Sequence, residues 1–98
     1  MSPELIIRPE AETEMTTAFD WYEERVKGLG SEFLLAVDAT FQVILRSPHQ
    51  YSVVYKTVRR ALLRRFPHEV FFISAENRVV VITVFHTRRN PKHWQDRT

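Results

Sequence analysis

The stretch VVVITVF, Val79–Phe85, decides the fold, because its seven residues are apolar or β-branched and show no polar alternation. Such residues favour strands, and a short run that is apolar on both sides is typical of an interior strand. The stretch therefore predicts the central strand of a sheet that is covered on both faces. Directly before it, Ala75–Arg78 (AENR) contains the residues of a tight turn.

Two more strands are predicted on the N-terminal side of this turn, over Glu69–Ser74 and Val58–Arg65. The segment Phe66–His68 (FPH) links them, so that His68 is interpreted as a turn residue after Pro67. Connections this short place consecutive strands side by side and antiparallel. The three strands should therefore form a meander.

The first half of the chain predicts two helices after one short strand. Leu5–Arg8 is the strand, and Pro9 closes it because proline cannot continue a ladder. From about Ala11 the apolar residues recur with a helical period, and Gly28 and Gly30 mark the end of this helix. The apolar stripe of this first helix comprises Met15, Ala18, Phe19, Tyr22, Val26 and Leu29.

A second helix is predicted from Ser31, which can cap its N-terminus, to Pro48, which stops it. A loop then runs to about Lys56. Because only two or three residues join the first helix to the second, the two helices form an antiparallel hairpin that can cover the sheet. The fold class is therefore α+β in the order β-α-α-β-β-β, with a helix hairpin packed on a small, mainly antiparallel sheet. Residues 1–98 are expected to form a single domain.

The composition excludes several classes of protein. The 98 residues are 44% hydrophobic and contain no cysteine, which excludes disulfides, cysteine-bound zinc and thiol catalysis. Two glycines are too few for a phosphate-binding loop, and no histidine has a carboxylate at a metal-ligand offset such as H-E-x-x-H. No apolar run approaches the roughly 18 residues of a membrane span, and the N-terminus lacks a basic-then-apolar signal segment. We therefore expect a soluble, cytoplasmic protein with no cofactor, no metal site and no membrane contact.

Charge is divided unequally between the two halves of the chain. Residues 1–55 carry four Lys/Arg and nine Asp/Glu, a net charge of −5, whereas residues 56–98 carry ten and three, a net charge of +7. A basic half of this kind can face a polyanion or an acidic partner. The two halves can equally neutralise each other in the fold, and charge alone favours neither alternative.

Basic and aromatic residues collect around the predicted strand ends. Four arginines precede Phe66, and VFHTRRNPKHW, Val84–Trp94, places more charge directly after the apolar strand. Guanidinium groups bind phosphate oxygens bidentately and stack on bases, although any of these arginines can instead pair with a helical glutamate. The candidate target-binding residues are Arg59, Arg60, Arg64, Arg65, His86, Arg88, Arg89, Lys92 and Trp94.

Two of these candidates have a structural alternative. His86 follows a buried strand, which would hold its side chain rigidly for proton transfer, but a partly buried structural histidine also fits this position. Trp94 can stack on a base or pack back onto the sheet.

The β-α-α-β-β-β order, the segment VRRALLRRFPHEVFF (Val58–Phe72) and the ending VFHTRRNPKHW (Val84–Trp94) together resemble the RelE/ParE superfamily of bacterial toxins. The resemblance covers nearly the whole chain in order and length. It implies the toxin of a type II toxin–antitoxin pair, a class linked to plasmid stabilisation and growth arrest. It also implies a small cognate antitoxin protein that wraps around the toxin and neutralises it.

The resemblance implies two alternative targets. RelE-like members cut mRNA on the ribosome, which requires a general base, charge stabilisation and a proton donor; here His86, Arg64, Arg65 and Arg88 would supply them. The RNA-cutting members usually place a tyrosine near the C-terminus, and this chain has none after Tyr55. The ending H-x-R-R-N-P-x-x-W is more similar to the ParE-like branch, which inhibits DNA gyrase. A nucleic-acid-binding module without toxicity is a third hypothesis.

Overall fold

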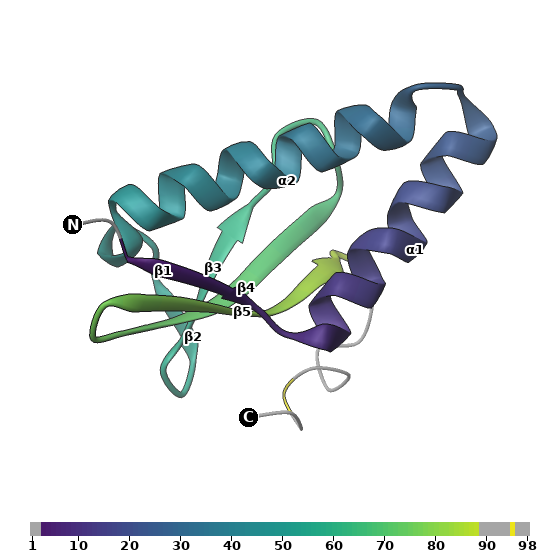
Figure 1. Cartoon of the computed structure of the whole chain (residues 1–98). Coiled ribbons are helices and arrows are strands. Elements are labelled where there is room, and N and C mark those ends of the chain that lie inside the picture. The colour runs from purple at the N-terminus through teal and green to yellow at the C-terminus, as the bar shows by residue number, and fades with distance from the viewer. Residues whose placement is uncertain (1–2, 89–94, 96–98) are drawn as a thin grey trace.

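Five strands form one sheet, and two helices lie together on one face of it (Figure 1). The structure is a computed structural model that describes residues 3–88 and residue 95. No helix in this described part of the chain is both long and apolar enough to cross a bilayer. The elements are, in chain order, β1 (Glu4–Ile7), α1 (Pro9–Arg25), α2 (Leu29–Arg46), a 3-10 turn (Pro48–Gln50), β2 (Val53–Tyr55), β3 (Val58–Leu62), β4 (His68–Ala75) and β5 (Arg78–His86).

The strand order across the sheet is β1-β5-β4-β3-β2. Strands β2 to β5 form an antiparallel meander, and β1 pairs parallel with β5. The α+β prediction of a helix hairpin on a small, mainly antiparallel sheet is therefore confirmed. The strand that was not predicted is β2, which lies in the segment interpreted as a loop. Its three residues pair irregularly with β3 and are too few to show an alternating pattern.

Two predicted strand assignments are wrong in detail. The apolar stretch Val79–Phe85 lies in β5, between β1 and β4, and β4 is the middle strand of the five. Strand β3 ends at Leu62 rather than at Arg65, and residues 64–67 form a bend before β4. Arg65 cannot belong to the strand because its backbone is left-handed, with a φ of 71°.

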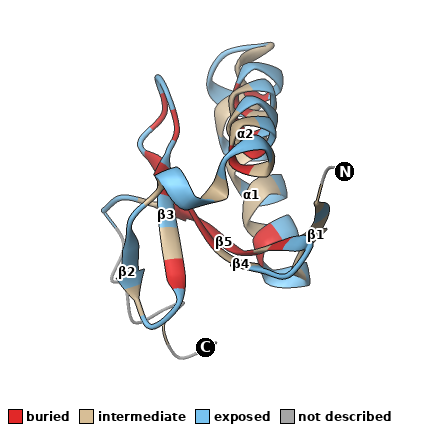
Figure 2. Cartoon of the chain, turned by 90° about the vertical axis from the view of Figure 1, so that its left-hand side faces the viewer, coloured by how far each residue is buried: buried red, intermediate tan, exposed pale blue. Residues whose placement is uncertain are grey.

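Apolar side chains pack on both faces of the sheet, but the helices cover only one face (Figure 2). The helix-covered face holds the main core, in which fully buried residues of α2, β4 and β5 meet, among them Phe33, Val37, Ile44, Phe72, Val79 and Val81. The opposite face carries a smaller cluster of Val58, Phe71, Ile82 and Phe85. Because β5 contributes to both clusters, its sequence lacks the polar alternation of a strand with one solvated face.

A carboxylate and two glycines set the connection between the helices. Of the two glycines predicted to end the first helix, Gly28 is left-handed, with a φ of 89°, whereas Gly30 lies inside α2. The backbone N–H groups of Gly28 and Gly30 donate to the two carboxylate oxygens of Glu23, at 2.8 and 3.0 Å, so a side chain of α1 caps α2. A Cβ on Gly30 would lie 2.7 Å from the carbonyl oxygen of Phe19, so the helices meet too closely there for a side chain. The predicted cap, Ser31, is wrong, because this residue already lies inside the first turn of α2.

A bulge in β5 lies beside Thr83, the residue that connects the sheet to α1. Phe72 is opposite Val81 and Phe71 is opposite Thr83, so β5 carries one more residue than β4 between these pairs. A bulge interrupts the alternation of a strand and re-aims its side chains. The buried Thr83 hydroxyl donates to a carboxylate oxygen of Glu14 at 2.7 Å. This hydrogen bond holds α1 against the C-terminal half of β5.

Candidate functional site

Several of the predicted site residues meet at one edge of the sheet. Strands β3 and β5 both run antiparallel to β4, so their C-terminal ends lie at the same end of the sheet, where β4 begins. Arg64 and Arg65 follow β3, His86 ends β5 with Arg88 just beyond it, and His68 is opposite His86. We call these five residues the basic edge.

The three arginines of the basic edge are held differently. The Arg65 guanidinium lies 2.9 Å from a carboxylate oxygen of Glu32 in α2, with which it forms an exposed ion pair. Arg64 is exposed and makes no ion pair or side-chain hydrogen bond with another described residue. Arg88 is also exposed, and its backbone N–H donates to Nδ1 of His86 at 3.1 Å. Arg64 and Arg88 are thus the members of this edge whose guanidinium groups can bind an external anion.

The remaining predicted site residues lie elsewhere. Arg59 is opposite Phe72 near the middle of the sheet, and its guanidinium donates to the backbone carbonyl of Tyr51. Arg60 lies 3.9 Å from the carboxylate of Glu69 in the neighbouring strand. These two arginines are therefore not part of the basic edge. The candidates Arg89, Lys92 and Trp94 fall outside the residues that the structure describes.

His68 is not the turn residue that was predicted. It is the first residue of β4 and only 6% exposed. Its ring centroid lies 4.9 Å from that of Phe33, 5.1 Å from that of His86 and 5.9 Å from that of Tyr22. The signal was present in the sequence, because His68 continues the alternation of Val70 and Phe72, two buried residues in the main core.

The histidine pair allows limited acid–base chemistry at the basic edge. Because Nδ1 of His86 accepts a hydrogen bond, its neutral ring carries the proton on Nε2. Burial raises the pKa of the Tyr22 hydroxyl above its ordinary value, and the Tyr22 ring lies beside His68. Within the described part of the chain, no group of three or more His, Cys, Asp or Glu residues is arranged to hold a metal ion. The residues named for a nuclease, His86, Arg64, Arg65 and Arg88, share this edge, but Arg65 is engaged by Glu32.

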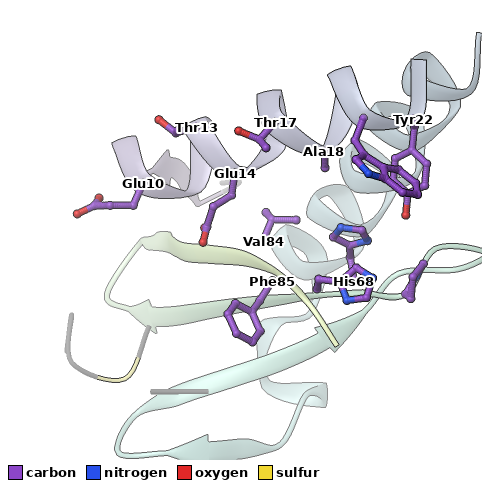
Figure 3. Close-up of a pocket in the computed structure, with 12 residues that line it drawn as sticks. Glu10, Thr13, Glu14, Thr17, Ala18, Tyr22, His68, Val84 and Phe85 are labelled. Carbon is purple, nitrogen blue, oxygen red and sulfur yellow. The ribbon is translucent and has the colours of Figure 1, made fainter. Parts of the chain in front are cut away.

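A groove with a volume of about 890 Å³ runs between α1 and the ends of β4 and β5 (Figure 3). One wall of the groove is α1, which contributes residues from Glu10 to Tyr22. The opposite wall is formed by the start of β4 and the end of β5, with His68, Val84 and His86. Figure 3 shows Glu14 reaching from α1 toward the sheet at one end, with Tyr22 and His68 at the other. We call it the α1 groove. Sequence reasoning missed it, because the same helix also buries a core stripe that accounts for its apolar period.

Comparisons with known proteins agree with this architecture. The family described as "ParE toxin of type II toxin-antitoxin system, parDE" matches residues 5–91. No curated protein matches the sequence. Among solved structures, a chain described as "Chromosomal ParDE TA system from P. aeruginosa" is similar, with a TM-score of 0.78 and 12% sequence identity. The similarity covers 89% of this chain and 98% of that chain, and at this identity it shows the shared fold.

Proposed function

The chain belongs to the family of ParE toxins of type II toxin–antitoxin systems, and from this we propose that it inhibits DNA gyrase and is neutralised by a small cognate antitoxin. The family model matches residues 5–91. Under this proposal the basic edge contacts the target.

The observation that carries the proposed site is the state of Arg64 and Arg88. Both guanidinium groups are exposed, and neither is paired with a carboxylate of the described residues. Both residues follow strands of a packed sheet, which restricts the conformations of their backbone. The entropy cost of ordering them on a target is therefore lower. A pair of forked cations on such an edge suits a phosphate backbone or an acidic protein surface.

Gyrase inhibition is favoured over RNA cleavage on chemical grounds. Cleavage by a 2′-hydroxyl needs a base and an acid on opposite sides of the phosphate. The chain has no tyrosine after Tyr55, and of the two histidines of the basic edge His68 is buried and His86 is partly buried. An edge that offers cations, one partly buried imidazole and one buried imidazole is better equipped to bind a target than to break a bond in it.

Induction of the protein alone in a bacterium tests this proposal. We expect growth to stop, chromosomal DNA to be cleaved or the DNA-damage response to be induced, and co-expression of the small protein encoded beside it to restore growth. Codon-positioned cuts in ribosome-bound mRNA that disappear with His86→Ala would instead favour the nuclease alternative. Unrestricted growth with abundant folded protein would contradict toxicity altogether and leave the third hypothesis, a harmless nucleic-acid-binding module.

A further inference from the structure

The imidazole of His86 connects the core of the molecule to the exposed turn that carries Arg88. His86 is the last residue of β5, and its ring centroid lies 5.1 Å from that of His68 on the neighbouring strand. The ring of His68 in turn lies 4.9 Å from that of Phe33, which is fully buried in the main core. Nδ1 of His86 accepts a hydrogen bond from the backbone N–H of Arg88 at 3.1 Å. A continuous series of contacts therefore runs from the core through two imidazole rings to the backbone of Arg88.

Two consecutive hydrogen bonds fix the backbone just beyond β5. The N–H of Thr87 donates to the carbonyl oxygen of Pro67 at 2.9 Å, and the N–H of Arg88 donates to His86. The first bond ties this segment to the bend that carries Arg64. The second bond joins a side-chain acceptor to the N–H two residues later, which is the arrangement of an Asx turn. Because this bond fixes the backbone at Arg88, it also sets the direction in which the Arg88 side chain leaves the chain.

The ring nitrogen that makes this hydrogen bond determines which role His86 can have. Because Nδ1 is the acceptor, the neutral ring carries its proton on Nε2. A general base must accept a proton from the reacting group, whereas the accepting nitrogen of His86 is directed at the backbone of its own chain. The geometry therefore suits a residue that positions its neighbour rather than one that removes a proton from a target.

We propose that His86 is a positioning residue of the basic edge, whose Nδ1 holds the turn at Arg88 and so directs the Arg88 guanidinium toward the target. The identity of that target rests on the proposed function, under which it is DNA gyrase. A side chain that is already directed loses less entropy on binding, and fixing the backbone of one residue is worth about tenfold in affinity. His86 contributes through Arg88 and makes no contact of its own with the target.

Two substitutions of His86 distinguish its two ring nitrogens. His86→Asn keeps an acceptor at the position of Nδ1, because both atoms are bonded to Cγ, and asparagine readily forms the same turn. His86→Gln moves the oxygen to the position of Nε2 and removes the acceptor from the turn. Both variants lose the ring that packs on His68, so the comparison isolates the hydrogen bond.

The inhibition of gyrase supercoiling is measured with both variants. We expect His86→Gln to need about tenfold more protein for half-maximal inhibition, and His86→Asn to restore inhibition to within about threefold of the wild-type protein. A histidine that exchanges a proton with the target would lose its activity in both variants, because neither amide can replace an imidazole in proton transfer. Equal losses in the two variants would therefore overturn the proposal.

A double-mutant cycle tests whether His86 acts through Arg88. His86→Gln and Arg88→Ala are measured singly and together. We expect His86→Gln to cost about tenfold in inhibition when Arg88 is present and nothing further when Arg88 is alanine. Additive losses would show that His86 contacts the target itself and would contradict a positioning role. The same cycle with Arg60→Ala is the control and should be additive, because Arg60 lies outside the basic edge.

Nuclear magnetic resonance tests the hydrogen bond without gyrase. Nitrogen–proton spectra of the purified full-length chain identify which ring nitrogen of His86 carries the proton and report the exchange of the Arg88 amide with water. We expect the proton on Nε2, and an Arg88 amide that exchanges several-fold faster in His86→Gln than in the wild-type protein or His86→Asn. The melting temperature of each variant reports whether it is folded.

The spectra separate this inference from the proposed function. A proton on Nδ1 of His86, or equal exchange of the Arg88 amide in all three proteins, would overturn the positioning role even if the protein inhibits gyrase. The expected spectra from a protein that leaves gyrase unaffected would refute the proposed function and leave His86 as the residue that holds the turn at Arg88.

Discussion

Helix α1 and the segment from β3 to the start of β4 carry charges of opposite sign. Residues 9–25 include six Asp/Glu and one arginine, whereas residues 58–67 include four arginines and no acidic residue. In α1, Glu23 caps the next helix and Glu14 holds the bulge of β5. In the basic segment, Arg65 is paired with Glu32, and Arg64 is exposed. Each region thus contains charges that maintain the fold and charges on the surface.

The sequence left open whether the acidic and basic halves of the chain neutralise each other in the fold. The two ion pairs found between described residues are Arg60–Glu69 and Arg65–Glu32, and only the second joins the acidic half of the chain to the basic half. Among the residues that the structure describes, one ion pair thus joins the two halves. Two acidic residues of α1, Glu10 and Glu14, line one wall of the α1 groove, and the basic edge adjoins its other wall through His68 and His86.

The largest effect should come from breaking the scaffold that both surfaces share. Phe72 is fully buried in the main core beneath the helices. Phe72→Ala should lower the free energy of unfolding by about 3–5 kcal/mol, through lost burial and the cavity left behind. Leu62→Ala, at a residue that is 60% exposed in the adjacent strand, is the control and should change it by less than about 0.5 kcal/mol. Urea denaturation measures both, and equal losses would contradict the assigned core.

A smaller effect should follow from removing a carboxylate of α1 that maintains the fold. Glu23→Ala deprives the backbone N–H groups of Gly28 and Gly30 of their acceptor, and should cost about 1–2 kcal/mol. Glu24→Ala removes the same charge at the next position, which is exposed, and should cost less than about 0.5 kcal/mol. If both variants unfold at the same urea concentration, the capping role of Glu23 is wrong.

The basic segment should show smaller changes in stability and larger changes in activity. Arg65→Ala breaks an exposed ion pair with Glu32 and should cost about 0.2–1 kcal/mol. Arg64→Ala and Arg88→Ala should leave the melting temperature almost unchanged but weaken growth arrest after induction. Arg60→Ala, away from the basic edge, is the matched control and should stay toxic. Full toxicity of Arg64→Ala and Arg88→Ala at wild-type protein levels would reduce the basic edge to a solvated surface.

The fold could be predicted from the sequence where one signal extends over many residues. The helical period from Ala11 and the apolar stretch Val79–Phe85 correctly predicted a helix hairpin and an interior strand. Strand β2 was missed because three residues carry no period. The cap of α2 was assigned to Ser31 rather than to Glu23. Glu23 belongs to α1, and its carboxylate reaches the backbone N–H of Gly28 only because of the way the chain turns between the two helices.

The candidate site could be predicted only in part. The positions of Arg64 and Arg88 at one edge follow from a meander, in which alternate strands end on the same side. The burial of His68 was readable from its alternation with Val70 but was overlooked because Pro67 precedes it. The α1 groove could not have been predicted, since it depends on how far α1 lies from the end of β5, and a sequence pattern carries no such distance.

Inhibition of purified DNA gyrase tests the central claim most directly. The supercoiling of relaxed plasmid is measured with the wild-type protein, with the double variant Arg64→Ala, Arg88→Ala, and with Arg60→Ala. We predict that the wild-type protein and Arg60→Ala block supercoiling or trap cleaved DNA. The double variant should need a protein concentration at least about tenfold higher for the same inhibition. Unaffected supercoiling by a folded wild-type protein that cuts mRNA on translating ribosomes would contradict the account.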